Sequence, residues 1–260
     1  MPLPAGQSQR IILTGATSGI GAALARRYAT AGATLGLIAR RRPELERLSA
    51  ELGASCNIYP LDVRDAAALA AAARDFVHRH GTPDVVIANA GVSVGTLTDF
   101  AEDARAFQDV IDTNVIGMVN TFQPFLSNMR AAGHGALAGI ASVAGYRGLP
   151  GAGAYSASKA AVIAYLESLR VELRASGIRV ITICPGFIDT PMTEKNPYPM
   201  PFRMSAEAAA ISIASLIARG KAYTVIPWQM AIVARLLRVT PNWLYDRLVG
   251  GVPHKPRRAA

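Results

Sequence analysis

Cysteine is scarce in this chain of 260 residues, which contains only Cys56 and Cys184. The two lie far apart in apolar runs, a placement typical of buried free thiols rather than of metal ligands. The four histidines add no ligand motif. The sequence therefore predicts no metal site, and nothing in it indicates an oxidising compartment.

Long apolar runs and a leader pattern are also missing. No stretch of about 18 apolar residues predicts a membrane-spanning helix. The opening residues, MPLPAGQSQR, lack the charged-then-apolar pattern of a signal peptide. We therefore expect a cytoplasmic protein. Hydrophobic residues make up 51% of the chain, which is enough to form a substantial core.

Acidic residues are fewer than basic ones, 18 against 27, which gives a net charge of +9. The excess is concentrated in residues 221–260, which hold seven lysines and arginines but one acid, Asp246. Such a segment fits an anionic membrane surface, a nucleic acid or simple solubility. We expect no nucleic-acid partner, because the segment lacks an aromatic stacking platform.

A glycine-rich turn is the first feature that points to a ligand. Residues 10–14, RIILT, are typical of a buried parallel strand, and TGATSGIG at 14–21 joins it to a helical pattern. Gly15, Gly19 and Gly21 permit a tight turn that a pyrophosphate can approach, and a helix N-terminus offers free N–H groups. The spacing is G-x-x-x-G-x-G, and its place between strand and helix predicts a dinucleotide site.

Three arginines, Arg40, Arg41 and Arg42, follow the next expected strand at residues 34–39. The end of this strand faces the adenosine ribose in dinucleotide-binding folds, where an acid suits NAD and an arginine suits the 2′-phosphate of NADP. The sequence therefore predicts NADP(H) in preference to NAD(H). The alternative is that these arginines only solvate the start of a helix.

Strand and helix patterns alternate along the rest of the chain. Further strands are expected at residues 55–61, 84–88, 136–141, 178–184 and 223–226, and helices at 66–80, 103–129, 155–175 and 206–219. This alternation predicts an α/β fold, a single Rossmann-type doubly wound parallel sheet flanked by helices, over residues 1–226. Its strands would end at one edge, where such folds bind ligands.

Tyr155 and Lys159 lie four positions apart, so a helix would place both side chains on one face. The ammonium group is expected to lower the pKa of the phenol, which can then exchange a proton with a carbonyl or alcohol oxygen. By spacing alone, an ordinary pair on a helix surface is the commoner case.

Several motifs occur in one order along roughly residues 8–220. They are TGATSGIG (14–21), Asp62-Val63, Asn89-Ala90-Gly91, Asn114, Ser142, YSASK (155–159) and PGFIDTPM (185–192). The set resembles the short-chain dehydrogenase/reductase family. The resemblance implies that Tyr155 exchanges the proton and that Ser142 binds the substrate oxygen. It also implies that Lys159 tunes Tyr155 and binds the nicotinamide ribose, while Asn114 holds a water linking Lys159 to solvent.

The resemblance also implies a set of cofactor-binding residues, with Asp62 and Val63 flanking the adenine. The set is Gly15, Thr17, Ser18, Gly19, Ile20, Gly21, Arg40, Arg41, Asp62, Val63, Asn89, Ala90, Gly91, Tyr155, Lys159, Pro185, Gly186, Ile188 and Thr190. The last four of these would lie against the nicotinamide. A homodimer or tetramer through the helices of Asn114 and Tyr155 is the family expectation.

Residues 187–204 form the expected substrate lid. Four prolines alternate there with adaptable apolar side chains, which are Met192, Tyr198, Met200, Phe202 and Met204. Side chains of this kind suit an apolar ketone or alcohol, such as a lipid-like or steroid-like molecule. The alternative is a loop that only covers the cofactor.

Residues 227–260 depart from the family's short tail and predict a C-terminal amphipathic helical extension. Apolar residues recur at helical spacing with arginines between them, and Pro241 predicts the start of a second helix. We expect the extension to pack on or beside the domain. A membrane surface, the substrate pocket and a partner subunit are the alternatives, and the altered C-terminus argues against a tetramer.

The leading hypothesis is an NADP(H)-dependent oxidoreductase that transfers a hydride between the nicotinamide and a carbonyl or secondary alcohol. The rival is a catalytically silent dinucleotide-binding regulatory or scaffold protein. A binding module needs no proton relay, so the set Asn114, Ser142, Tyr155 and Lys159 favours the enzyme.

Overall fold

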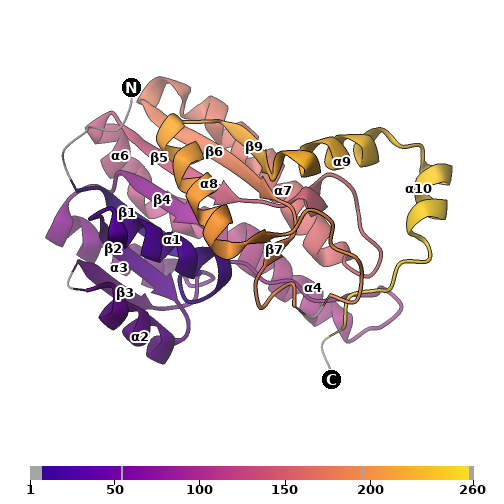
Figure 1. Cartoon of the computed structure of the whole chain (residues 1–260). Coiled ribbons are helices and arrows are strands. Elements are labelled where there is room, and N and C mark those ends of the chain that lie inside the picture. Colours follow the sequence, from indigo (N-terminus) through magenta and orange to yellow (C-terminus); the bar gives the residue numbers. More distant parts are fainter. Residues whose placement is uncertain (1–7, 54, 195, 258–260) are drawn as a thin grey trace.

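A parallel sheet forms the centre of the molecule (Figure 1). The computed structural model describes residues 8–53, 55–194 and 196–257, and within them seven strands pair in the order β3-β2-β1-β4-β5-β6-β9, every neighbouring pair parallel. They are β1 (Arg10–Thr14), β2 (Thr34–Ala39), β3 (Cys56–Pro60), β4 (Val85–Ala88), β5 (Gly135–Ile140), β6 (Ile178–Pro185) and β9 (Tyr223–Ile226). The predicted doubly wound α/β fold is confirmed.

The ends of the chain lie outside the described residues. Residues 1–7, which include most of the opening segment, and residues 258–260, which include Arg258 of the basic tail, belong to these ends. In the ranges that the structure covers, no helix is both long enough and apolar enough to cross a membrane.

Two helical layers bury the faces of the sheet. Ile11 and Leu13 of β1 point into one core, and Ile12 points into the other, as the two-residue period of a strand requires. The first core is covered by α1 (Gly19–Thr30), α2 (Arg42–Leu52) and α8 (Ala206–Arg219). The second is covered by α3 (Ala66–His80), α5 (Gly117–Phe122), α6 (Leu126–Ala132) and α7 (Gly153–Glu172), and α4 (Asp103–Ile111) packs on α7.

The order of the strands reverses beside β1. The chain runs outward from β1 to β2 and β3, then returns to β4 on the other side of β1 and continues to β9. The connections after β1 and β4 therefore diverge, which leaves a crevice at their carboxyl ends.

The expected long helix over residues 103–129 is present, but it is not a uniform α-helix. A π-helical turn, Asp112–Ile116, separates α4 from α5, and a 3-10 turn, Gln123–Phe125, separates α5 from α6. A π turn inserts one extra residue into the helix. It turns Asn114 inward, where its side chain meets the backbone of Val92, so a tertiary contact overrides the helical periodicity.

Two helices follow β9, as predicted, with the break at Pro241. They are α9 (Trp228–Val239) and α10 (Asn242–Val249), and they lie at one end of the molecule in Figure 1. Arg147 ties them to the domain, since its guanidinium donates to the carbonyls of Leu237 and Thr240 at 3.3 and 3.0 Å. The same group lies 4.3 Å from the ring centroid of Tyr245.

Candidate active site

The glycine-rich turn after β1 is joined to the end of β4 by short polar contacts. Asn89 donates from Nδ2 to the carbonyls of Thr14 and Gly15 at 3.0 and 3.2 Å. The Thr14 hydroxyl in turn accepts the backbone N–H groups of Asn89 and Ala90. Gly15 and Gly19 adopt φ values of +67° and +51°, which favour glycine. This turn leads into the N-terminus of α1, whose first turn carries no acidic residue.

A cleft of about 430 Å³ opens at the carboxyl edge of the sheet. All the predicted cofactor-binding residues line it except Gly21, and three of the four predicted catalytic residues do so, Asn114 being the exception. A Cβ on Gly21 would lie 2.0 Å from the carbonyl oxygen of Gly15, so Gly21 lets the turn and helix pack together. Pro191, Met192 and Thr193 of the predicted lid also line the cleft. The prediction missed wall residues outside these motifs, namely Ala39, Leu61, Val92, Thr113, Ile140 and Ala141.

Ser142, Tyr155 and Lys159 meet at one end of this cleft. Ser142 follows β5 and caps a short turn, where its Oγ accepts the N–H of Ala144 at 3.2 Å. Tyr155 and Lys159 lie on α7, one helical turn apart. The Nζ of Lys159 donates to the carbonyl of Ile140 at 2.8 Å and lies 5.7 Å from the centre of the Tyr155 ring.

The expected lowering of the Tyr155 pKa by Lys159 is wrong for the protein without ligands. Burial raises the pKa of the Tyr155 phenol, and a hydrogen bond with Ser142 offsets only part of that rise. Burial also lowers the pKa of Lys159 to about 8. The ammonium group of Lys159 donates to the Ile140 carbonyl instead of the phenol. Burial therefore decides the direction of the shift in the Tyr155 pKa.

Asn114 has no exposed surface and acts as a brace. Its Oδ1 accepts the N–H of Val92 at 2.8 Å, and its Nδ2 donates to the carbonyl of Val92 and to the hydroxyl of Ser158. The residue therefore connects the π turn to α7 and to the loop after β4. This arrangement makes Asn114 a positioning residue for the cleft wall.

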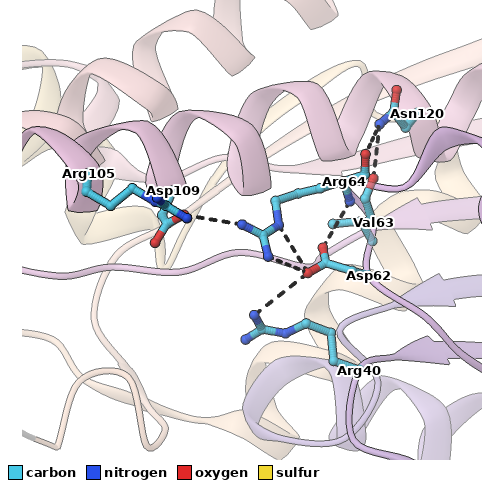
Figure 2. A network of polar contacts seen from close by, with 7 residues as sticks. All are labelled: Arg40, Asp62, Val63, Arg64, Arg105, Asp109 and Asn120. Atoms are coloured by element: carbon cyan, nitrogen blue, oxygen red, sulfur yellow. Dashed lines mark hydrogen bonds and ion pairs between the residues drawn. The ribbon is translucent and has the colours of Figure 1, made fainter.

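A chain of charges borders the other end of the cleft (Figure 2). Asp62 accepts hydrogen bonds from the guanidinium of Arg64 at 2.8 and 3.0 Å, and Arg40 lies 3.9 Å from the same carboxylate. Partial burial works to raise the pKa of Asp62, but Arg64 and Arg40 together hold it below its ordinary value. Arg41 reaches across to the Thr17 hydroxyl at 3.2 Å. Arg40 and Arg41 thus line the cleft with largely exposed guanidinium groups.

The C-terminal tail forms a strap over the loop after β4, which sequence reasoning missed. The Nζ of Lys255 donates to the Ser93 hydroxyl at 2.9 Å and to the carbonyl of Met192, on the lid, at 3.3 Å. Arg257 pairs with Asp103 at 2.7 Å. No local pattern signals these contacts, because the partners lie more than 60 residues away in the chain.

The two cysteines form no disulfide with each other. Cys184 is buried and free, as predicted, and burial raises its pKa to about 11; Cys56 is also free but only partly buried. Among the side chains that the structure describes, no three His, Cys, Asp or Glu residues gather as metal ligands.

Comparison with known proteins identifies the family of the chain. A family model described as short chain dehydrogenase matches residues 9–199. An uncharacterized oxidoreductase of Myxococcus xanthus is 40% identical over 238 residues, which cover 90% of this chain and 94% of the relative.

Two solved structures share the fold. An actinorhodin polyketide ketoreductase with NADPH is 30% identical at a TM-score of 0.76, over 84% of this chain and 95% of that one. A 3-ketoacyl-(acyl-carrier-protein) reductase of Brucella melitensis with NADH is 22% identical at a TM-score of 0.78, over 85% of this chain and 97% of that one. The protein belongs to the short-chain dehydrogenase family of oxidoreductases.

Proposed function

We propose that the protein is an NADP(H)-dependent reductase of apolar ketones that uses Ser142, Tyr155 and Lys159. The observation that carries the proposal is the meeting of these three side chains in a cleft whose other end presents Arg40 and Arg41. The hydroxyl groups of Ser142 and Tyr155 suit a reacting carbonyl oxygen at one end of the cleft. The guanidinium groups at the other end suit a phosphate.

The residues of the cleft fit such a cofactor. A Cβ on Gly19 would meet the side chain of Thr190 at 2.8 Å, so glycine keeps a narrow passage open above the N-terminus of α1. The free N–H groups of that terminus, without a nearby acid, suit a pyrophosphate. One solved neighbour holds NADPH and the other NADH, so the arginines, not the fold, support the choice of NADP(H).

The nicotinamide would supply a hydride to the carbonyl carbon of the substrate. Tyr155 would donate its phenolic proton to the carbonyl oxygen as negative charge develops there, and Ser142 would donate a second hydrogen bond to the same oxygen. Burial raises the pKa of the Tyr155 phenol, so at neutral pH the group carries the proton that it would donate. Lys159, held by Ile140, would contribute positive charge beside the ribose.

The lid supports the substrate class that we propose. Pro191 and Met192 line the cleft. Phe187 and Tyr198 of the lid do not line it and lie against each other, with 6.4 Å between their ring centroids. Pro191 and Met192 offer apolar contact to a substrate, and we propose a lipid-like or other apolar ketone or alcohol. The catalytically silent scaffold is not favoured, because the relatives are oxidoreductases and reductases and the proton-donating groups meet in one place.

A fluorescence titration with NADPH and NADH, followed by a ketone screen with the preferred cofactor, tests the proposal. We expect tighter binding of NADPH and turnover of apolar ketones in preference to sugars. Preference for NADH would contradict the role of the arginines. Binding of neither dinucleotide would contradict the function as a whole.

A further inference from the structure

The outer face of α9 is apolar and exposed. Trp228, Ile232, Leu236 and Val239 follow one another at helical spacing and are 68%, 50%, 60% and 75% exposed. Trp243 of α10 is exposed to a similar extent. We call these five residues the apolar face. Soluble monomers rarely leave a run of large apolar side chains in water without a function for it.

The domain itself does not cover this face. The two helices pack on the domain through their inner sides, where Met230 and Ala234 of α9 and Tyr245 of α10 are buried. The Tyr245 hydroxyl donates to the carbonyl of Gly148, and Arg147 holds the carbonyls at the end of α9. The helices are therefore fixed in place with the apolar face directed outward.

Positive charge accompanies the apolar face. Arg235 lies seven positions after Trp228, on the same side of α9, and Arg247 of α10 is also exposed. Arg238 is exposed too, but its guanidinium donates to the carbonyl of Tyr146 at 3.1 Å. Within the described part of the chain none of these three arginines forms an ion pair with a carboxylate. The charges of Arg235 and Arg247 are therefore available to an anionic partner.

A second copy of the chain is a poor partner for this surface. A two-fold interface places the same patch on both sides, so it would bring the arginines of one copy close to those of the other. An anionic bilayer avoids this repulsion. Tryptophan favours the membrane–water interface, apolar side chains enter the acyl region, and arginine contacts the phosphates.

We propose that α9 and α10 form a peripheral membrane-binding surface that recognises anionic phospholipid. The helices lie in the plane of the interface, the apolar face enters it, and Arg235 and Arg247 contact the headgroups. Figure 1 shows both helices at the end of the molecule away from β3, where a flat surface can approach them. The inference does not depend on the proposed catalysis, because binding is measured without turnover.

Flotation of the full chain with lipid vesicles tests the proposal. We expect co-flotation with vesicles of phosphatidylcholine mixed with phosphatidylglycerol, and much less with phosphatidylcholine alone. The double variant Ile232→Ser/Leu236→Ser should lower the partition constant at least about tenfold. Each of Arg235→Gln and Arg247→Gln should lower it roughly fivefold on anionic vesicles only. The control Ile211→Ser, which removes an exposed apolar side chain from α8, should bind like the unaltered protein.

Intrinsic fluorescence gives a second readout. The chain contains two tryptophans, Trp228 and Trp243, and both are exposed in the proposed surface. Their emission should shift to shorter wavelength when anionic vesicles are added and should return when salt screens the attraction. The proposal is overturned if the intact protein does not float with anionic vesicles, or if the serine double variant floats equally well. It is also overturned if that variant changes the oligomeric mass without lipid, because a second copy would then cover the face.

Discussion

Lys159 is a buried cation whose contacts come from a backbone carbonyl and not from a carboxylate. Burial lowers its pKa to about 8, against an ordinary value of 10.5. The folded protein therefore releases this proton at a lower pH than the unfolded chain, so stability rises with pH between about 8 and 10. Below that window the buried positive charge of Lys159 lowers the free energy of unfolding. Deprotonation of the ammonium group removes this destabilisation.

This difference predicts a measurable pH dependence of stability. Between pH 7 and pH 9 the protein without cofactor should gain about 1 kcal/mol more in free energy of unfolding than the variant Lys159→Met. Denaturant unfolding of both proteins across this range measures the difference. Burial also lowers the pKa of Lys255, but that group is present in both proteins and cancels. Parallel curves for the two proteins would contradict the burial of a charged Lys159.

Arg40 sets the cofactor preference in our account. Replacing it by glutamine removes charged hydrogen bonds to a 2′-phosphate, so the ratio of NADH to NADPH dissociation constants should fall about tenfold. The matched control is Arg42→Gln, because Arg42 pairs with Glu46 at 3.7 Å and does not line the cleft. Fluorescence titration of both variants is the measurement. An unchanged ratio in Arg40→Gln, or an equal fall in both variants, would assign the preference elsewhere.

The elements of the fold differ in how far local sequence determines them. The apolar run of β1 and the glycine turn after it are local signals, so residues 10–21 predict their own structure. The π turn depends on Asn114 meeting Val92, 22 positions earlier, and Lys255 meets Ser93 across 162 positions. Periodicity carries no information about such distant partners. The cleft could therefore be predicted from the sequence. The contacts of Asn114 with Val92 and of Lys255 with Ser93 could not.

The C-terminal strap should restrain the lid. Lys255→Met removes the contacts to the carbonyl of Met192 and to Ser93, which together hold the lid beside the loop after β4. We expect chymotrypsin to cleave within residues 187–204 roughly fivefold faster, in line with the loss of about 1 kcal/mol. Lys221→Met, an exposed change in the connection between α8 and β9, is the control. Mass spectrometry of the fragments locates the cut, and wild-type cleavage rates in Lys255→Met would contradict a restraining strap.

At the scale of the whole molecule, large exposed apolar residues also occur on helices other than α9 and α10. Phe107, Ile116 and Val171 are exposed on α4, the π turn and α7, far in sequence from the apolar face of α9. We propose that α4 and α7 pair with their copies about a two-fold axis to form a homodimer. Light scattering after size exclusion should give a dimer mass for the wild type and a monomer mass for Ile116→Asp/Val171→Asp. A dimer mass for that double variant would contradict this interface, and Ile211→Asp on α8 serves as the control.

The proton donor is the central claim, and Tyr155→Phe tests it most directly. The variant keeps the ring that lines the cleft and loses only the hydroxyl, so the NADPH dissociation constant should stay unchanged. In NADPH-dependent reduction of a ketone that the wild type accepts, kcat should fall by about 10²–10⁴-fold. Equal kcat values in the two proteins, with equal NADPH binding, would show that Tyr155 does not supply the proton and would contradict the account.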